Sequence, residues 1–106
     1  MLFRSKFQSG FKVSCIYGGH STKTESLSLS ETPSVIIGTP GKISYHIRKE
    51  NFDPTEVNYL VLDEFDKSLE MGFQDEMEFI IQNLINVKQK ILTSATKMDE
   101  IGRAHV

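Results

Sequence analysis

Residues 58–68 read NYLVLDEFDKS, and the rest of the sequence is best interpreted outward from them. The first half is a short apolar run of residues that favour strands, the pattern of a buried strand. The run stops abruptly at a group of carboxylates, Asp63, Glu64 and Asp66. The stretch therefore predicts a strand that delivers acidic side chains to one edge of a sheet.

Similar apolar runs occupy residues 11–17, 34–38 and 90–94. The segments between the runs are too long for hairpins and suit crossovers that contain a helix. Residues 21–31 and 40–50 are predicted helices, and another follows Phe73, where apolar residues recur at helical spacing. That apolar stripe consists of Met77, Ile80, Ile81, Leu84 and Ile85. The alternation predicts an α/β fold, a parallel sheet with flanking helices.

In such sheets ligands bind beyond the carboxyl ends of the strands, so the segments that follow the apolar runs form the candidate site. These segments are Gly18-Gly19-His20, Thr39-Pro40-Gly41-Lys42, Asp63-Glu64-Phe65-Asp66 and Ser94-Ala95-Thr96. All of them are expected along one edge of the sheet. His20 is interpreted as a loop histidine rather than a catalyst or ligand.

The acidic segment has two interpretations. An Asp directly after an apolar strand, followed by Glu, is the arrangement with which P-loop NTPases hold Mg²⁺ and orient the attacking water. Asp63 would then contact the metal or its waters, and Glu64 would act on the water. The alternative is structural, because carboxylates also stabilise the N-terminus of a helix, here one expected to begin near Lys67.

The tetrapeptide TPGK, residues 39–42, has the composition of a helix start. Thr39 can cap the helix, Pro40 suits its first turn, and Gly41 lets the backbone come close to a ligand. Such a start favours anions, including a nucleic-acid phosphate, or is simply an ordinary helix N-terminus. It is not a Walker A loop, because G-x-x-x-x-G-K-[ST] requires Gly at position 36 and Ser or Thr at 43, and both are Ile.

The ordered set YGG, TPGK, DEFD, GF and SAT resembles the second half of the first RecA-like domain of DEAD-box RNA helicases, over residues 11–98. The resemblance implies ATP-dependent unwinding of RNA, with ATP and Mg²⁺ as cofactors. Asp63 and Glu64 would serve catalysis, Asp63 holding Mg²⁺ through water. The contact that couples hydrolysis to unwinding would be formed by Asp66, Ser94 and Thr96. The residues facing RNA would be Gly18, Gly19, Thr39, Gly41 and Lys42.

The sequence departs from the family pattern at two of these positions. Lys42 stands where the family usually has Arg, so that a point charge replaces a bidentate fork and a looser phosphate contact is expected. Phe65 stands where the family usually has Ala, and its ring must find room in the core. Both catalytic carboxylates and Asp66 are retained.

The resemblance also predicts what surrounds this sequence. The family's P-loop strand would precede residue 11 and its second RecA-like domain would follow SAT, so residues 1–100 are expected to be a partial RecA-like domain without the P-loop strand, inactive by itself. Residues 101–106, IGRAHV, correspond to the codons ATC GGA AGA GCA CAC GTC of a common sequencing adapter and are expected to be an adapter-derived tail. Two alternatives stay open: a stand-alone RNA-binding or interaction module without ATPase activity, and a DNA helicase of the same superfamily.

Composition sets broad limits. With 106 residues, 25% charged residues and a formal net charge of -2, the sequence is that of one ordinary globular domain. A slightly negative total does not exclude nucleic acid, because a local patch can bind phosphates. The single cysteine, Cys15, is expected to be a small buried apolar residue and fits a reduced, cytoplasmic location. No apolar run approaches the length of about 20 residues that a membrane span requires.

Overall fold

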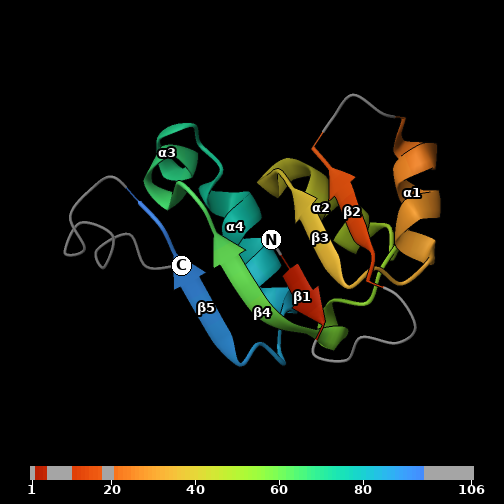
Figure 1. The fold of residues 1–106 in the computed structure, drawn as a ribbon. Coiled ribbons are helices and arrows are strands. Elements are labelled where there is room, and N and C mark those ends of the chain that lie inside the picture. The colour runs from red at the N-terminus through yellow and green to blue at the C-terminus, as the bar shows by residue number, and fades with distance from the viewer. Residues whose placement is uncertain (1, 5–10, 18–20, 95–106) are drawn as a thin grey trace.

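The computed structural model describes residues 2–4, 11–17 and 21–94. Its strands are β1 (Leu2–Arg4), β2 (Val13–Ile16), β3 (Val35–Gly38), β4 (Val57–Leu62) and β5 (Gln89–Leu92). They form one sheet in the order β2-β3-β1-β4-β5 (Figure 1). The pairs β2–β3 and β4–β5 are parallel, which confirms the predicted α/β fold with a parallel sheet.

Strand β1 was not predicted, and it makes the sheet mixed. It lies between β3 and β4 and runs antiparallel to both. Leu2 is paired with Ile36 on one side and with Leu60 on the other. With only three residues, LFR, the strand is too short to carry the alternation that marked the other runs.

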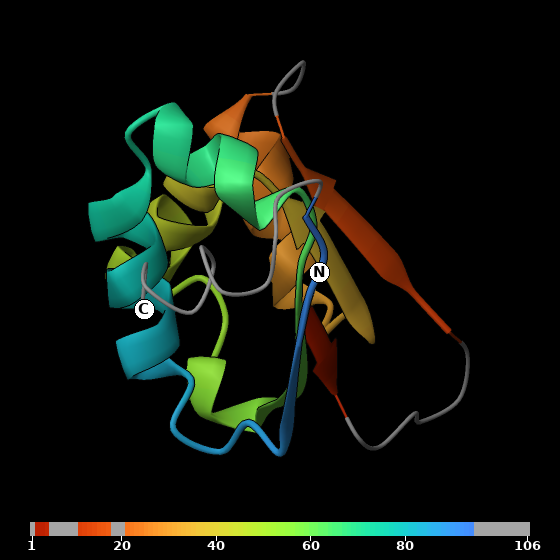
Figure 2. The same ribbon diagram turned by 90° about the vertical axis from the view of Figure 1, so that its left-hand side faces the viewer.

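The helices of the described residues are α1 (Thr22–Ser30), α2 (Pro40–Arg48), α3 (Phe65–Glu70) and α4 (Gln74–Asn83), with a short 3₁₀ helix η1 (Pro54–Glu56). Helix α1 begins after Ser21, whose side chain accepts a hydrogen bond from the Thr24 backbone N–H. Turning the molecule by 90° shows the helices gathered on one side of the sheet (Figure 2). Among these helices none is long and apolar enough to cross a membrane.

The hydrophobic core lies between the sheet and these helices. Ile16, Ile36 and Leu60 from the strands pack there with residues of α1, α2 and α4; the cluster also contains Leu2, Leu29, Ile43, Ile47, Val57, Ile80 and Leu84. The opposite face of the sheet carries exposed apolar side chains, among them Val13 on β2 and Ile91 on β5. Burial is therefore one-sided in the described part of the chain.

Two sequence-based expectations need correction. Helix α4 ends at Asn83, so Ile85 lies beyond it and is 71% exposed rather than part of the buried stripe. The helix stops because the chain turns back to the sheet, where the Lys88 N–H donates to the Asn58 carbonyl at 2.7 Å. Cys15 is only partly buried, since it occupies the open face of β2 while its neighbours Ser14 and Ile16 point into the core.

Candidate functional site

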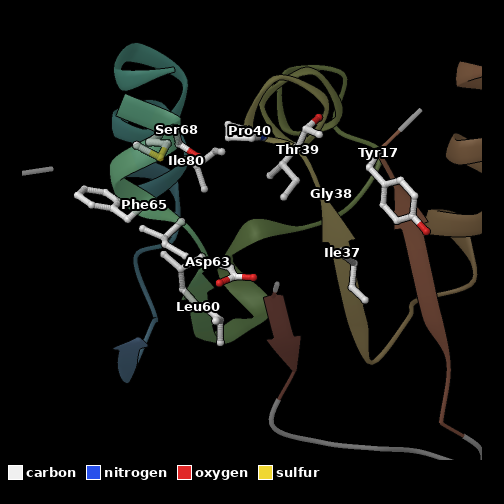
Figure 3. A pocket seen from close by; sticks show the side chains of 14 residues that line it. Tyr17, Ile37, Gly38, Thr39, Pro40, Leu60, Asp63, Phe65, Ser68 and Ile80 are labelled. Atoms are coloured by element: carbon white, nitrogen blue, oxygen red, sulfur yellow. The ribbon is translucent and has the colours of Figure 1, made fainter. Parts of the chain in front are cut away.

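The ends of β3 and β4 border a cavity of about 360 Å³ at the carboxyl edge of the sheet (Figure 3). Thr39 and Pro40 lie on one side of the cavity, and Asp63 and Phe65 on the other. In the described part of the chain, β1 pairs with β3 at Val35 and Ile36 and reaches Leu60 on β4, so no described strand lies between the last residues of β3 and β4. Two of the predicted segments therefore meet at one edge of the sheet.

The TPGK segment forms the start of α2, as predicted. The Thr39 hydroxyl accepts a hydrogen bond from the Lys42 backbone N–H at 3.4 Å, and Pro40 occupies the first turn. A side chain added at Gly41 would meet nothing within 4 Å, so the backbone there is open to a ligand. Gly38, just before the segment, is different: a Cβ would come within 2.6 Å of Ile16 Cγ1, so packing requires glycine there.

Behind this helix start lies a buried polar network that the sequence analysis missed. One oxygen of the Glu25 carboxylate, Oε1, lies 3.1 Å from Lys42 Nζ and 3.0 Å from His46 Nε2. The exposed fractions of Glu25 and His46 are 1% and 0%. Asn51 Nδ2 lies 2.8 Å from His46 Nδ1 and 3.1 Å from Ser26 Oγ. In the sequence Glu25 is one of many polar residues in a helix with little apolar periodicity, so only the packing of α1 on α2 reveals its role.

The charge on Glu25 is retained in spite of its burial. Burial by itself would raise the pKa of this carboxyl, but hydrogen bonds from His46 and Lys42 and the positive charge of Lys42 outweigh it and hold the pKa below its usual range. Glu25 is thus a buried carboxylate anion, compensated through its Oε1 atom. Its other oxygen, Oε2, is buried without a hydrogen-bond partner among the described residues.

The acidic turn follows β4 and is organised differently. Asp63 and Glu64 are exposed, and Glu64 has left-handed backbone angles (φ 52°, ψ 48°), which non-glycine residues seldom adopt. The Glu64 side chain forms no capping hydrogen bond to α3, which begins at Phe65 rather than near Lys67. A side-chain cap from Glu64 therefore has no counterpart in the structure, whereas Asp66 does lie in the first turn of α3, where the structural interpretation expects a carboxylate.

Thr93, at the end of β5, holds this turn in place. Its hydroxyl donates to Asp63 Oδ1 and accepts the Glu64 backbone N–H at 3.1 Å. Its carbonyl accepts the Phe65 N–H at 2.9 Å. Thr93 was not among the predicted site residues, although its place directly before SAT was a usable signal. These bonds connect the segment that precedes Ser94 to the acidic turn across the parallel β4–β5 pair.

The Phe65 ring is accommodated in a small core of its own. It is 1% exposed and packs with Met77, with Leu62 and Leu69 at the margin. The expectation that Phe65 packs is confirmed. Asp66 lies half-buried in the first turn of α3 and Ser94 half-buried after β5. Gly18, Gly19 and Thr96 lie outside the described residues, so their predicted roles stay predictions.

A divalent cation at this edge would be held by Asp63 and not by a closed cage of described side chains. Within the described ranges no group of three or more His, Cys, Asp or Glu side chains converges on a point. Asp63 is exposed, and a carboxylate oxygen is a ligand that Mg²⁺ prefers. Because Mg²⁺ keeps several waters and is bound through one or two carboxylates plus substrate phosphates, this donor set fits it.

Comparison with known proteins decides the family. The family described as DEAD/DEAH box helicase matches residues 2–103. The chain belongs to this family. The DEAD/DEAH box assignment agrees with the resemblance found in YGG, TPGK, DEFD and SAT, and it spans both the β2–β3 and the β4–β5 halves of the sheet.

Individual relatives are ATP-dependent RNA helicases by name. The chain is 36% identical over 102 residues to the ATP-dependent RNA helicase CshA of Listeria monocytogenes, covering 96% of the chain and 20% of that protein. It is 39% identical over 92 residues to the DEAD-box ATP-dependent RNA helicase CshA of Bacillus subtilis, covering 87% of the chain and 19% of that protein. The chain thus spans about a fifth of the length of these curated relatives.

Solved structures agree on the fold. A DEAD box protein from the hyperthermophile Methanococcus jannaschii superposes with a TM-score of 0.79 at 34% identity, over 89% of this chain and 26% of the other. A hypothetical ATP-dependent RNA helicase from Sulfolobus tokodaii superposes with a TM-score of 0.80 at 30% identity, over 89% and 28% respectively. The fold seen in this chain is therefore that of the matching region of DEAD-box proteins.

Proposed function

We propose that this chain is the C-terminal half of the first RecA-like domain of an ATP-dependent RNA helicase, which couples ATP hydrolysis to RNA strand unwinding. The observation that supports this most is the edge of the sheet: the acidic turn after β4 and the TPGK start of α2 border the same cavity. Hydrolysis and RNA binding would then be served by neighbouring strands of one sheet.

Asp63 and Glu64 would carry the chemistry. Asp63, oriented by Thr93, would hold Mg²⁺ through water, and the ion would neutralise charge on the phosphates of ATP. Glu64 would orient and deprotonate the attacking water, a role that suits an exposed carboxylate held in a fixed backbone turn. Asp66, Ser94 and Thr96 would form the contact that transmits hydrolysis to unwinding.

RNA would bind along the ends of β2 and β3 and the start of α2. Thr39 and Gly41 present a hydroxyl and an unobstructed backbone there, as a sugar-phosphate chain requires. Gly18 and Gly19 would continue this surface. Lys42 belongs to the same turn, but its ammonium group is engaged by Glu25.

Residues 1–100 would be inactive without a P-loop to cradle the phosphates, and residues 101–106 would be adapter-derived. A long read of the source DNA tests this directly. Codons for G-x-x-x-x-G-K-[ST] upstream of residue 1 and natural sequence past residue 100 would support the proposal. A ribosome-binding site before Met1 and a stop codon after Val106 would instead favour a stand-alone binding module.

The activity itself is tested on the full-length protein. ATP turnover should rise on addition of single-stranded RNA, and Glu64→Gln should abolish that turnover. Stimulation by single-stranded DNA in place of RNA would favour the DNA helicase alternative. Equal turnover with and without either nucleic acid would contradict both.

A further inference from the structure

Lys42 carries the positive charge of the TPGK turn, yet its side chain points inward. Its Nζ lies 3.1 Å from Glu25 Oε1, and its side chain is only 29% exposed. The pair joins two helices, since Glu25 belongs to α1 and Lys42 to α2, 17 positions later in the sequence. The ammonium group is therefore partly buried between the two helices.

His46 contacts the same carboxylate oxygen from further along α2. Its Nε2 lies 3.0 Å from Glu25 Oε1, and its Nδ1 lies 2.8 Å from Asn51 Nδ2. Lys42 is the lysine that ion-pairs with this buried carboxylate, and its positive charge helps to balance the negative charge of Glu25.

We infer that Lys42 is an internal counter-ion for Glu25 and does not neutralise an RNA phosphate. If the ammonium group moved out to a phosphate, the Glu25 carboxylate, which is 1% exposed, would lose its lysine counter-ion and keep only His46 as a partner. Leaving a buried charge uncompensated is strongly unfavourable, whereas the phosphate would gain a contact that water and salt already screen. Lys42 is a positioning residue that fixes the start of α2, and RNA contacts at this turn come from Thr39 and the Gly41 backbone.

The inference rests on the proposed RNA-binding function and is tested through salt dependence. For single strands, the slope of log K against log salt changes by about 0.7 for each phosphate contact. Binding of a single-stranded oligoribonucleotide to the full-length protein is measured at several salt concentrations for wild type, Lys42→Gln and Lys49→Gln. Lys49 lies exposed at the other end of α2 and controls for loss of a charge.

All three proteins should give the same slope. A slope shallower by about 0.7 in Lys42→Gln alone would identify Lys42 as a phosphate ligand and overturn the inference. Should Lys42→Gln fail to fold, the double variant Glu25→Gln, Lys42→Gln replaces it, because it removes the buried anion together with its counter-ion. The double variant should also keep the wild-type slope, and a loss of about 0.7 would again overturn the inference.

A second measurement separates this inference from the proposed function. If wild type binds no RNA at any salt concentration, the proposed function is wrong, and unfolding of the same variants decides the role of Lys42. Glu25→Gln and Lys42→Gln should each lower the melting temperature, and the double variant should lose less than the sum of the two losses. Additive losses would show that the two side chains are not coupled, which overturns the counter-ion assignment.

Discussion

The start of α2 and the acidic turn lie at the same edge of the sheet but are held in different ways. The start of α2 is supported by a buried network of Glu25, Lys42 and His46. The acidic turn leaves Asp63 and Glu64 in solvent and is fixed by one hydroxyl and the backbone of Thr93. The charged side chains behind the start of α2 therefore bind one another, whereas the carboxylates of the acidic turn are accessible to a ligand.

The starts of the helices show the same contrast. Helices α1 and α2 begin with side-chain caps from Ser21 and Thr39. Helix α3 begins at Phe65, and its N-cap residue Glu64 is left-handed and provides no side-chain cap. Neither feature is confined to the acidic turn: Thr32 and Glu50 are also left-handed, and α4 begins without a side-chain cap at Phe73. Glu64 combines both features directly after a strand.

The largest effect should come from Glu64→Gln in the full-length protein. RNA-stimulated ATP turnover should fall at least about 100-fold, because the amide cannot take a proton from water. Unfolding by urea should change by less than about 0.5 kcal/mol, since the side chain is exposed. Glu70→Gln, also exposed on α3, is the matched control and should leave turnover unchanged. Wild-type turnover in Glu64→Gln would show that Glu64 does not act on the attacking water, and that the acidic turn is not the catalytic region.

On the other side of the contrast, His46→Ala should lower the free energy of unfolding by about 3 kcal/mol. The substitution deletes a ring that is 0% exposed and leaves Glu25 and Asn51 without their shared partner. Lys49→Ala, exposed at the end of the same helix, should change stability by less than about 0.5 kcal/mol. Urea unfolding measures both. Equal, small effects would mean that the buried network does not anchor α2.

Thr93 allows the acidic turn to be disturbed without touching its carboxylates. Thr93→Val keeps the shape of the side chain but removes the hydroxyl that joins Asp63 Oδ1 to the Glu64 N–H. Turnover should fall about tenfold, equivalent to about 1.4 kcal/mol, and the Mg²⁺ concentration needed for half-maximal turnover should rise. Thr93→Ser retains the hydroxyl and should stay close to wild type. If valine and serine behave alike, the hydroxyl does not position Asp63.

The helix starts provide a smaller test. Ser21→Ala should lower the free energy of unfolding by about 1 kcal/mol, because it removes the acceptor for the Thr24 N–H at 3.1 Å. Glu64→Ala should not lower the free energy of unfolding through loss of a cap, since the Glu64 side chain makes no capping hydrogen bond. Urea unfolding of the two variants compares a capped start with an uncapped one. A larger loss of stability in Glu64→Ala than in Ser21→Ala would show that Glu64 stabilises the start of α3 more than Ser21 stabilises the start of α1.

The sequence was sufficient for much of the fold, because periodicity reports local structure. The runs that became β2, β3, β4 and β5 were predicted from their apolar, strand-favouring residues, and the helix start at Thr39 was predicted from the residue types of TPGK. Strand β1 was beyond this approach, since its pairing with β3 and β4 depends on residues far away in the chain. The wrong prediction for Ile85 has the same cause: its spacing continues the helical pattern, but the chain leaves the helix to reach β5.

Some features of the candidate site could likewise be predicted from the sequence, and others could not. Asp63 and Thr39 could be placed at one edge because both directly follow predicted strands. The Glu25–His46 contact could not be predicted, because it joins helices whose residues are 21 positions apart and depends on how α1 packs beside α2. Sequence patterns find the ends of strands, whereas partners across a helix interface require the fold.

The smallest expected effect concerns pH, at Asp53, which caps the short helix η1 before β4. Hydrogen bonds from the Thr55 side chain and backbone N–H to the Asp53 carboxylate lower the pKa of Asp53. A folded-state pKa below the unfolded value stabilises the fold above the unfolded pKa, and this contribution is lost as pH falls through the folded pKa. Asp53→Asn should therefore cost less than about 0.5 kcal/mol at pH 7, because solvent screens an exposed group, and nothing at about pH 2.

Glu25 has a lowered pKa as well, so wild-type stability should also fall with pH through the loss of its carboxylate. Asp53→Asn separates the two contributions: the variant should lose nearly as much stability on acidification as wild type, because Glu25 is buried and Asp53 is exposed. Urea midpoints at a series of pH values between 7 and 2 measure the difference. If Asp53→Asn removed most of the acid sensitivity, the Glu25–Lys42 pair would contribute little to the free energy of unfolding. The start of α2 and the acidic turn would then differ in their contacts but not in how much those contacts stabilise the fold.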